Sequence, residues 1–231
     1  MNKLGFSLIQ KLNKILRSIV RETTNYKMIS RLYATKYNKI KVREHTYFYE
    51  TRDGQNFSDS PLQILMAVLQ SDKNAEHFIV YQNRYFDEVI LGLNIQKIDV
   101  EKMPNVHLVE RNTPKYVEAQ LFSKYLITDS TFQSFFVKKP EQIYINTWHG
   151  TPLKLMGYAM PDGEFQSWNV MRNFMMSDYL VSPNKHTTEI FLNDYHLNGA
   201  YTGGILEIGY PRNDVFFNQN NQSLLHQYLI E

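Results

Sequence analysis

The chain has 231 residues, of which 43% are apolar, enough for one sizeable hydrophobic core or two small ones. It contains no cysteine, which excludes disulfides and thiolate metal sites. The net charge of +2 is unevenly spread, because residues 1–43 hold 11 basic residues and one acidic residue (+10), whereas residues 44–231 hold 14 and 22 (−8).

The basic segment, residues 1–43, is predicted to begin with an amphipathic helix. Apolar residues recur at helical spacing from Leu4 to Val20, and basic residues fill much of the remaining face. This pattern is typical of a helix in a membrane interface, so an anionic membrane surface is an expected partner. A helix that packs on the protein's own body is the alternative. Nucleic acid is not expected as a partner, because no basic patch interleaved with aromatic residues follows.

Residues 22–43 remain basic and polar and are interpreted as a connector or the end of this arm. Beyond them, short apolar runs alternate with amphipathic segments. The expected strands cover residues 46–50, 77–81, 106–109, 125–128, 142–145, 179–181 and 205–208. The expected helices start at Ser60-Pro61 and cover residues 113–124, 165–177 and 182–192. The alternation predicts an α/β fold over residues 44–218, a Rossmann-like parallel sheet with helices on both faces.

Polar loops follow several of the expected strands, and a parallel sheet would bring these loops to one edge. The most informative loop carries His149, Thr151 and Lys154 directly after a buried strand. An imidazole at a strand end is a candidate proton acceptor, and a nearby lysine is a candidate phosphate partner. A turn with a polar tip is the alternative. The other loops carry Asp53-Gly54, Asp129-Ser130-Thr131, Ser182-Pro183-Asn184 and Gly209 to Asp214.

Five segments form a distinctive set of motifs. The longest is Asn146 to Gly157, with the sequence Asn-Thr-Trp-His-Gly-Thr-Pro-Leu-Lys-Leu-Met-Gly. The others are Asp59-Ser60-Pro61, Lys124 to Ser130, Asp178 to Asn184 and Gly209 to Asp214. Together these segments resemble the CDP-glycerol glycerophosphotransferases, the primases and polymerases of teichoic acid. The resemblance implies the amino-terminal, acceptor-binding half of a two-domain glycosyltransferase-B fold. Residues 219–231 would then start the connection to an absent donor domain.

The resemblance also implies a reaction, in which a hydroxyl of a lipid-linked acceptor attacks the β-phosphorus of CDP-glycerol or a related donor and CMP leaves. His149 matches the histidine proposed as the general base of the family. Lys154 and Arg212 would offset phosphate charge, and Thr151 would orient a hydroxyl. For Lys154 the alternative is a solvated residue on a helix. For Arg212 the alternative is an ion pair with Asp214, and Asp214 would be either that partner or an N-cap.

Ser182 and Asn184 are expected to start a helix, with substrate contact as the second interpretation, and Trp148 is expected to pack in the core. No cofactor or metal is expected. The predicted protein lies peripherally on the cytoplasmic face of the cell membrane, and without a donor domain the chain alone is expected to be inactive. A non-catalytic module that binds polymer or a partner protein is the alternative function, and a sugar-nucleotide glycosyltransferase is a weaker one.

Overall fold

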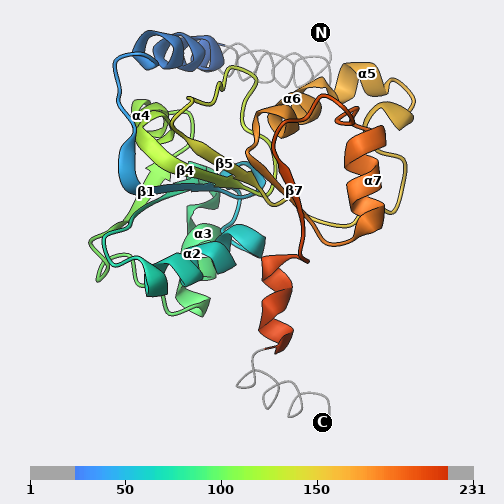
Figure 1. Ribbon diagram of the computed structural model, residues 1–231. Helices are drawn as coiled ribbons and strands as arrows, with labels where there is room; N and C mark the ends of the chain where they lie inside the picture. Colours follow the sequence, from blue (N-terminus) through green and yellow to red (C-terminus); the bar gives the residue numbers. More distant parts are fainter. Residues whose placement is uncertain (1–23, 218–231) are drawn as a thin grey trace, which may run out of the picture.

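The computed structural model describes residues 24–217, and a seven-stranded parallel sheet runs through them (Figure 1). The order across the sheet is β3-β2-β1-β4-β5-β6-β7, and every neighbouring pair is parallel. The strands are β1 (Arg43–Glu50), β2 (Glu76–Tyr81), β3 (Val106–Glu110), β4 (Ser123–Thr128), β5 (Ile143–Asn146), β6 (Tyr179–Ser182) and β7 (Gly204–Glu207). This confirms the predicted α/β fold and each of the predicted strands.

Helices and short 3-10 segments connect the strands. The helices are α2 (Asp59–Ser71), α3 (Phe86–Ile95), α4 (Pro114–Phe122), α5 (Gly163–Gln166), α6 (Trp168–Met176) and α7 (Lys185–Asn193). The 3-10 segments are η1 (Arg52–Gly54), η2 (Asn83–Tyr85), η3 (Gly157–Ala159) and η4 (Pro211–Phe217). The single helix predicted over residues 165–177 is divided at Ser167 into α5 and α6.

Helices cover both faces of the sheet. Successive side chains of each strand point to opposite faces, so each strand contributes to a core on either side. On β1, Phe48 points to one face and packs in a core that includes Tyr116 of α4. Tyr49 points to the other face, into a core shared with Leu65 of α2 and Val89 of α3. Figure 1 shows α2 and α3 on one side of the sheet and α4 on the other. A third cluster joins β6 to α6 and α7, with Leu180, Phe174 and Phe191 at its centre.

The interpretation of residues 22–43 as a connector is wrong for the part that the structure describes. Residues 24–36 are helical, and Ile29 and Tyr33 are buried in the same core as Phe48. Lys36 forms an ion pair with Glu118 of α4, so part of the arm's positive charge is bound within the molecule. The predicted amphipathic helix from Leu4 to Val20 lies outside the described residues. Within residues 24–217, no helix is both long and apolar enough to cross a membrane.

Helix α3 was not predicted, because its apolar residues do not form one stripe. Leu91 and Ile95 are 59% and 66% exposed, so they blur the helical period that the buried Val89 and Leu93 would show. Gly92 brings this helix close to the carbonyl of Phe57, and a Cβ atom there would lie only 2.3 Å from that oxygen. A close backbone contact, rather than a sequence period, therefore fixes the position of α3.

The sheet topology places a ligand crevice at the ends of β1 and β4. From β1 the chain adds β2 and β3 on one side, and then crosses back to add β4 to β7 on the other. In open parallel sheets, ligands bind beyond the carboxyl ends of the strands where the order reverses. Glu50 at the end of β1 is in register with Thr128 of β4, which is in register with Asn146 of β5. The loop with His149 therefore begins beside this crevice.

Candidate functional site

The loop after β5 has a conformation that buries Trp148 and exposes His149. The buried Asn146 side chain accepts a hydrogen bond from the Trp148 amide at 2.9 Å and donates one to the Ser130 carbonyl at 2.8 Å. Trp148 has φ 51°, in the left-handed region that a bulky residue rarely adopts. The bond from Asn146 and the burial of the indole ring against Phe174 offset that strain. Trp148 is 5% exposed, which confirms that it packs in the core.

His149 is exposed, and its ring is held in one tautomer. Its Nδ1 lies 2.7 Å from the backbone carbonyl of Asp129. A carbonyl oxygen can only accept, so Nδ1 donates the hydrogen and Nε2 carries the lone pair in the neutral ring. The imidazole also packs beside Trp148, with 4.1 Å between ring centroids. Orientation, tautomer and access together make Nε2 a competent proton acceptor.

Arg212 pairs with Asp59, and the predicted ion pair with Asp214 is wrong. Its Nη1 donates to Asp59 Oδ2 at 2.6 Å and to the His149 carbonyl at 2.9 Å. Asp214 is neither that partner nor an N-cap, because it lies within the turns of η4 and faces a groove that includes Ile64 of α2. Arg212 therefore ties η4 to the start of α2 and to the backbone of the histidine loop.

Asp129 is a buried carboxyl to which the sequence analysis gave no role. Its Oδ1 accepts from the Arg52 amide at 2.9 Å, and its Oδ2 has no hydrogen-bond partner within residues 24–217. Burial, with a further contribution from Asp59, raises the pKa of Asp129 to about 7. The sequence signal was an acidic residue directly after the apolar strand β4. Asp129 therefore joins the loops after β1, β4 and β5, since its own carbonyl holds His149.

The other predicted site residues fall into two groups. Thr151 and Lys154 lie on the loop with His149, where Lys154 is exposed and Thr151 is half-buried. Asn184 is the N-cap of α7, whereas Ser182 is the last residue of β6. The Asn184 side chain accepts from the Thr187 amide at 2.9 Å, and Ser182 Oγ donates to the Asn184 carbonyl at 2.8 Å. This confirms the expected helix start for Asn184, while Ser182 ends the preceding strand and bonds to the N-cap residue.

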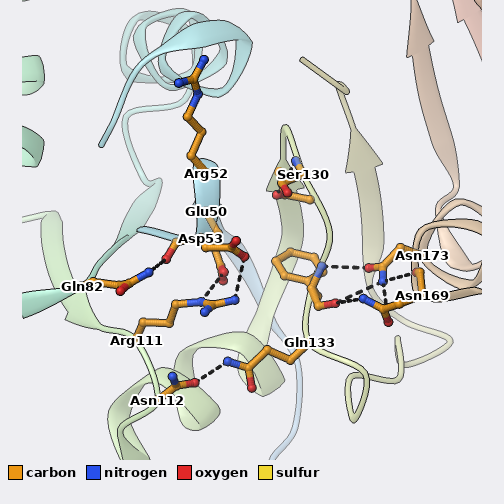
Figure 2. A network of polar contacts seen from close by, with 12 residues as sticks. Glu50, Arg52, Asp53, Gln82, Arg111, Asn112, Ser130, Gln133, Asn169 and Asn173 are labelled. Atoms are coloured by element: carbon orange, nitrogen blue, oxygen red, sulfur yellow. Dashed lines mark hydrogen bonds and ion pairs between the residues drawn. The ribbon is translucent and has the colours of Figure 1, made fainter. Parts of the chain in front are cut away.

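A second polar cluster, also missed by the sequence analysis, lies at the end of β1 (Figure 2). Arg111 donates from Nε to Glu50 at 2.7 Å and from Nη2 to Asp53 at 2.8 Å. The Tyr116 hydroxyl donates to the second oxygen of Glu50 at 2.7 Å. Burial raises the pKa of Glu50, and the guanidinium offsets part of that effect. Within residues 24–217, no cluster of three or more histidines and carboxylates could hold a metal ion.

A family assignment follows from the sequence that forms this site. Residues 31–230 match the family described as CDP-glycerol:poly(glycerophosphate) glycerophosphotransferase. The chain belongs to this family. The match spans both the histidine loop and η4, the two segments that Arg212 joins.

Named relatives act in teichoic acid synthesis. The chain is 31% identical over 198 residues to the teichoic acid poly(glycerol phosphate) polymerase of Staphylococcus epidermidis, a match that covers 82% of this chain and 25% of the relative. It is 27% identical over 207 residues to the teichoic acid glycerol-phosphate transferase of Staphylococcus aureus, covering 87% and 47%. The chain thus spans between a quarter and about half of these relatives.

Solved structures of the wall teichoic acid polymerase TagF have a similar fold. One superposes with a TM-score of 0.70 at 29% identity, covering 98% of this chain and 52% of the polymerase chain. A histidine-to-asparagine variant of that polymerase, soaked with CDPG, gives a TM-score of 0.72 at 28% identity and covers 99% and 55%.

Proposed function

We propose that this chain supplies the acceptor side of an active site that transfers glycerol phosphate, or a related polyol phosphate, from a CDP-activated donor. The acceptor is a hydroxyl of a lipid-linked polymer or sugar in teichoic acid or capsule synthesis. The observation that carries the proposal is the orientation of His149, whose Nδ1 is bound to the Asp129 carbonyl while the ring is exposed. The family assignment supplies the donor class.

The chemistry is a phosphoryl transfer with general-base assistance. His149 Nε2 takes the proton of the acceptor hydroxyl as its oxygen bonds to the β-phosphorus of the donor. The bond between that phosphorus and the bridging oxygen breaks, and the bridging oxygen leaves as part of CMP. Negative charge on the transferred group grows during this step, and the exposed Lys154 ammonium would offset it. Thr151 would orient the acceptor hydroxyl.

Two further parts of the proposal concern the rest of the protein. A second domain of the glycosyltransferase-B type would bind the CDP-activated donor across the crevice from His149. Residues 1–43 would hold the protein peripherally on the anionic cytoplasmic face of the membrane, which is supported by their charge of +10. Lys36 is tied to Glu118, so it would contribute less to that attraction than the other basic residues of the segment.

The test is release of CMP by this chain combined with a donor-binding domain of the family, on one polypeptide or on two. With CDP-glycerol and a lipid-linked acceptor, His149→Gln is expected to lower turnover about 10²- to 10⁴-fold. His107→Gln on the outer strand β3 is the matched control and should retain turnover. Full activity of His149→Gln would remove the base role. No release by the unmodified pair would favour the alternative, a non-catalytic binding module.

A further inference from the structure

A groove lined by charged and amide side chains lies next to the Arg111 cluster, at the same edge of the sheet as His149. Its volume is about 900 Å³, within the usual range of ligand sites. Its walls come from the helix over residues 24–36, from the segments that follow β1, β2, β3 and β4, and from the start of α6. The lining includes Lys27, Arg84, Arg111, Asp53, Trp168 and six asparagine or glutamine side chains.

The charges in this groove favour an anion. Its lining has three cations, Lys27, Arg84 and Arg111, and one carboxylate, Asp53, which is bound to Arg111. Lys27 and Arg84 are exposed, and within residues 24–217 neither has a carboxylate at ion-pair distance. The Arg84 guanidinium lies over the ring of Tyr85, 4.7 Å from its centroid, which orders it without neutralising it. Two cations thus remain available to a ligand.

The amides in the groove favour a ligand rich in hydroxyl groups. An amide side chain both donates and accepts, as does a hydroxyl, so the two match in either orientation. Figure 2 shows Gln82, Asn112 and Gln133 near the Arg111 cluster, and Asn169 beside Asn173 on the other side of the view. Gln133 donates to Asn112, while its Oε1 has no hydrogen-bond partner within residues 24–217. At the rim, Trp168 is 47% exposed and offers an apolar face to CH groups.

Two hydrogen bonds connect the groove with the proposed base. Asp53 in the groove follows Arg52, whose amide donates to Asp129 Oδ1 at 2.9 Å. The carbonyl of Asp129 in turn accepts from His149 at 2.7 Å. The groove and His149 therefore lie along one edge of the sheet, joined by a single buried residue.

We propose that this groove binds the non-reacting part of an anionic polyol-phosphate chain. Its phosphodiesters contact Lys27 and Arg84, its hydroxyls bond to the amides, and its terminal hydroxyl reaches His149. The identity of the chain as the acceptor rests on the proposed function. Binding itself needs neither the donor nor the chemical step, so the groove can be tested separately.

The experiment measures binding of a fluorescein-labelled oligo(glycerol phosphate) to the 231-residue chain by fluorescence anisotropy. The double variant Lys27→Gln, Arg84→Gln is expected to weaken binding about 10- to 100-fold, and Trp168→Ala about 3- to 10-fold. Lys73→Gln is the matched control, because this exposed lysine follows α2 at the opposite edge of the sheet. Its affinity should equal that of the unmodified chain. Thermal melting of each variant verifies that it folds.

Each outcome decides for or against the groove. Equal affinity of a folded double variant and the unmodified chain would overturn it, as would absence of binding to the unmodified chain. Competition by a neutral oligoglycerol or by inorganic phosphate as strong as that by the unlabelled oligomer would also overturn it, since the proposal requires both chemistries together. His149→Gln removes one hydrogen bond to the terminal hydroxyl, so it should weaken binding less than the double variant does. If that variant binds the oligomer and also retains full turnover, His149 is not the base, whereas the proposed binding in the groove is still supported.

Discussion

The ends of β1 and β5 lie at the same edge of the sheet but use their polar residues in opposite ways. At the end of β1, the buried Glu50 is bonded to Arg111, whose side chain is 13% exposed, and the Tyr116 hydroxyl donates to the other oxygen of Glu50. After β5, His149 and Lys154 are exposed, and among the described residues 24–217 only one nitrogen of the imidazole has a hydrogen-bond partner. Polar groups whose hydrogen bonds are all made within the protein hold the loops in place. Groups that keep a free donor or acceptor atom can bind a reactant. Variants on the two sides should therefore separate loss of stability from loss of activity.

The largest effect on stability is expected from Arg111→Met, which leaves Glu50 buried without its cation. Breaking a buried ion pair from one side costs about 3–5 kcal/mol of unfolding free energy, measured by urea denaturation at pH 7. Burial already raises the pKa of Glu50, so protonation relieves the uncompensated charge and the loss should shrink at acid pH. The double variant Glu50→Gln, Arg111→Met should recover part of the stability. A loss below about 1 kcal/mol would show that the cluster does not hold the edge.

Asp129→Asn should change how stability depends on pH. The pKa of Asp129 is raised to about 7 in the folded chain, above that of an unfolded aspartate. Between those values the folded state binds the extra proton, so this residue makes stability fall as pH rises toward 7. Over pH 5 to 7 the contribution is about 2–3 kcal/mol, at 1.36 kcal/mol for each unit.

The asparagine variant lacks this titration, so its stability relative to the unmodified chain should rise between pH 5 and pH 8 in urea titrations. Asp99→Asn serves as the control: the hydrogen bond from Lys102 lowers the pKa of Asp99, so this carboxyl is ionised throughout that range and its variant should show no such rise. Parallel pH profiles for Asp129→Asn and the unmodified chain would show that Asp129 is ionised throughout that range.

The sequence predicted the fold well because alternation of strand and helix is a local signal. It did not show α3, whose position depends on the contact of Gly92 with Phe57. It also did not show that the helix over residues 24–36 buries its Ile29 in the core. Both depend on surfaces that only the folded sheet creates. An apolar stripe remains visible in a sequence, whereas a close backbone approach does not.

The sequence predicted the histidine of the candidate site but not the ion pairs that hold the surrounding loops. His149 stands in a motif that can be read along the chain. The bond from Arg212 to Asp59 joins residues 153 positions apart, and that from Arg111 to Glu50 spans 61 positions. Such pairs can be predicted only when the strand order is known. The nearer Asp214 was therefore chosen as a partner for Arg212, although it lies in the turns of η4.

A smaller effect is expected from Arg212→Gln, which separates η4 from the histidine loop. Asp59, whose side chain is 8% exposed, loses its cation, at a cost of about 1–2 kcal/mol in unfolding free energy. Since Arg212 also holds the His149 carbonyl, backbone amides of residues 149–154 should exchange hydrogen faster. Arg212→Lys keeps the charge and should recover part of the stability. Unchanged exchange in Arg212→Gln would show that the loop is held by Asp129 and Asn146 alone.

The smallest effect, Asn184→Ala, tests whether the loop after β6 belongs to the site or only to the fold. The Asn184 side chain accepts from the Thr187 amide, so its removal should cost about 1 kcal/mol, as for other N-caps, in thermal or urea unfolding. Asn184→Ser retains an acceptor and should lose only a few tenths of that. Turnover in the two-domain assay and oligomer binding should both stay unchanged. Reduced turnover of a folded Asn184→Ala protein would show that the active site includes the loop after β6 as well as the loop after β5.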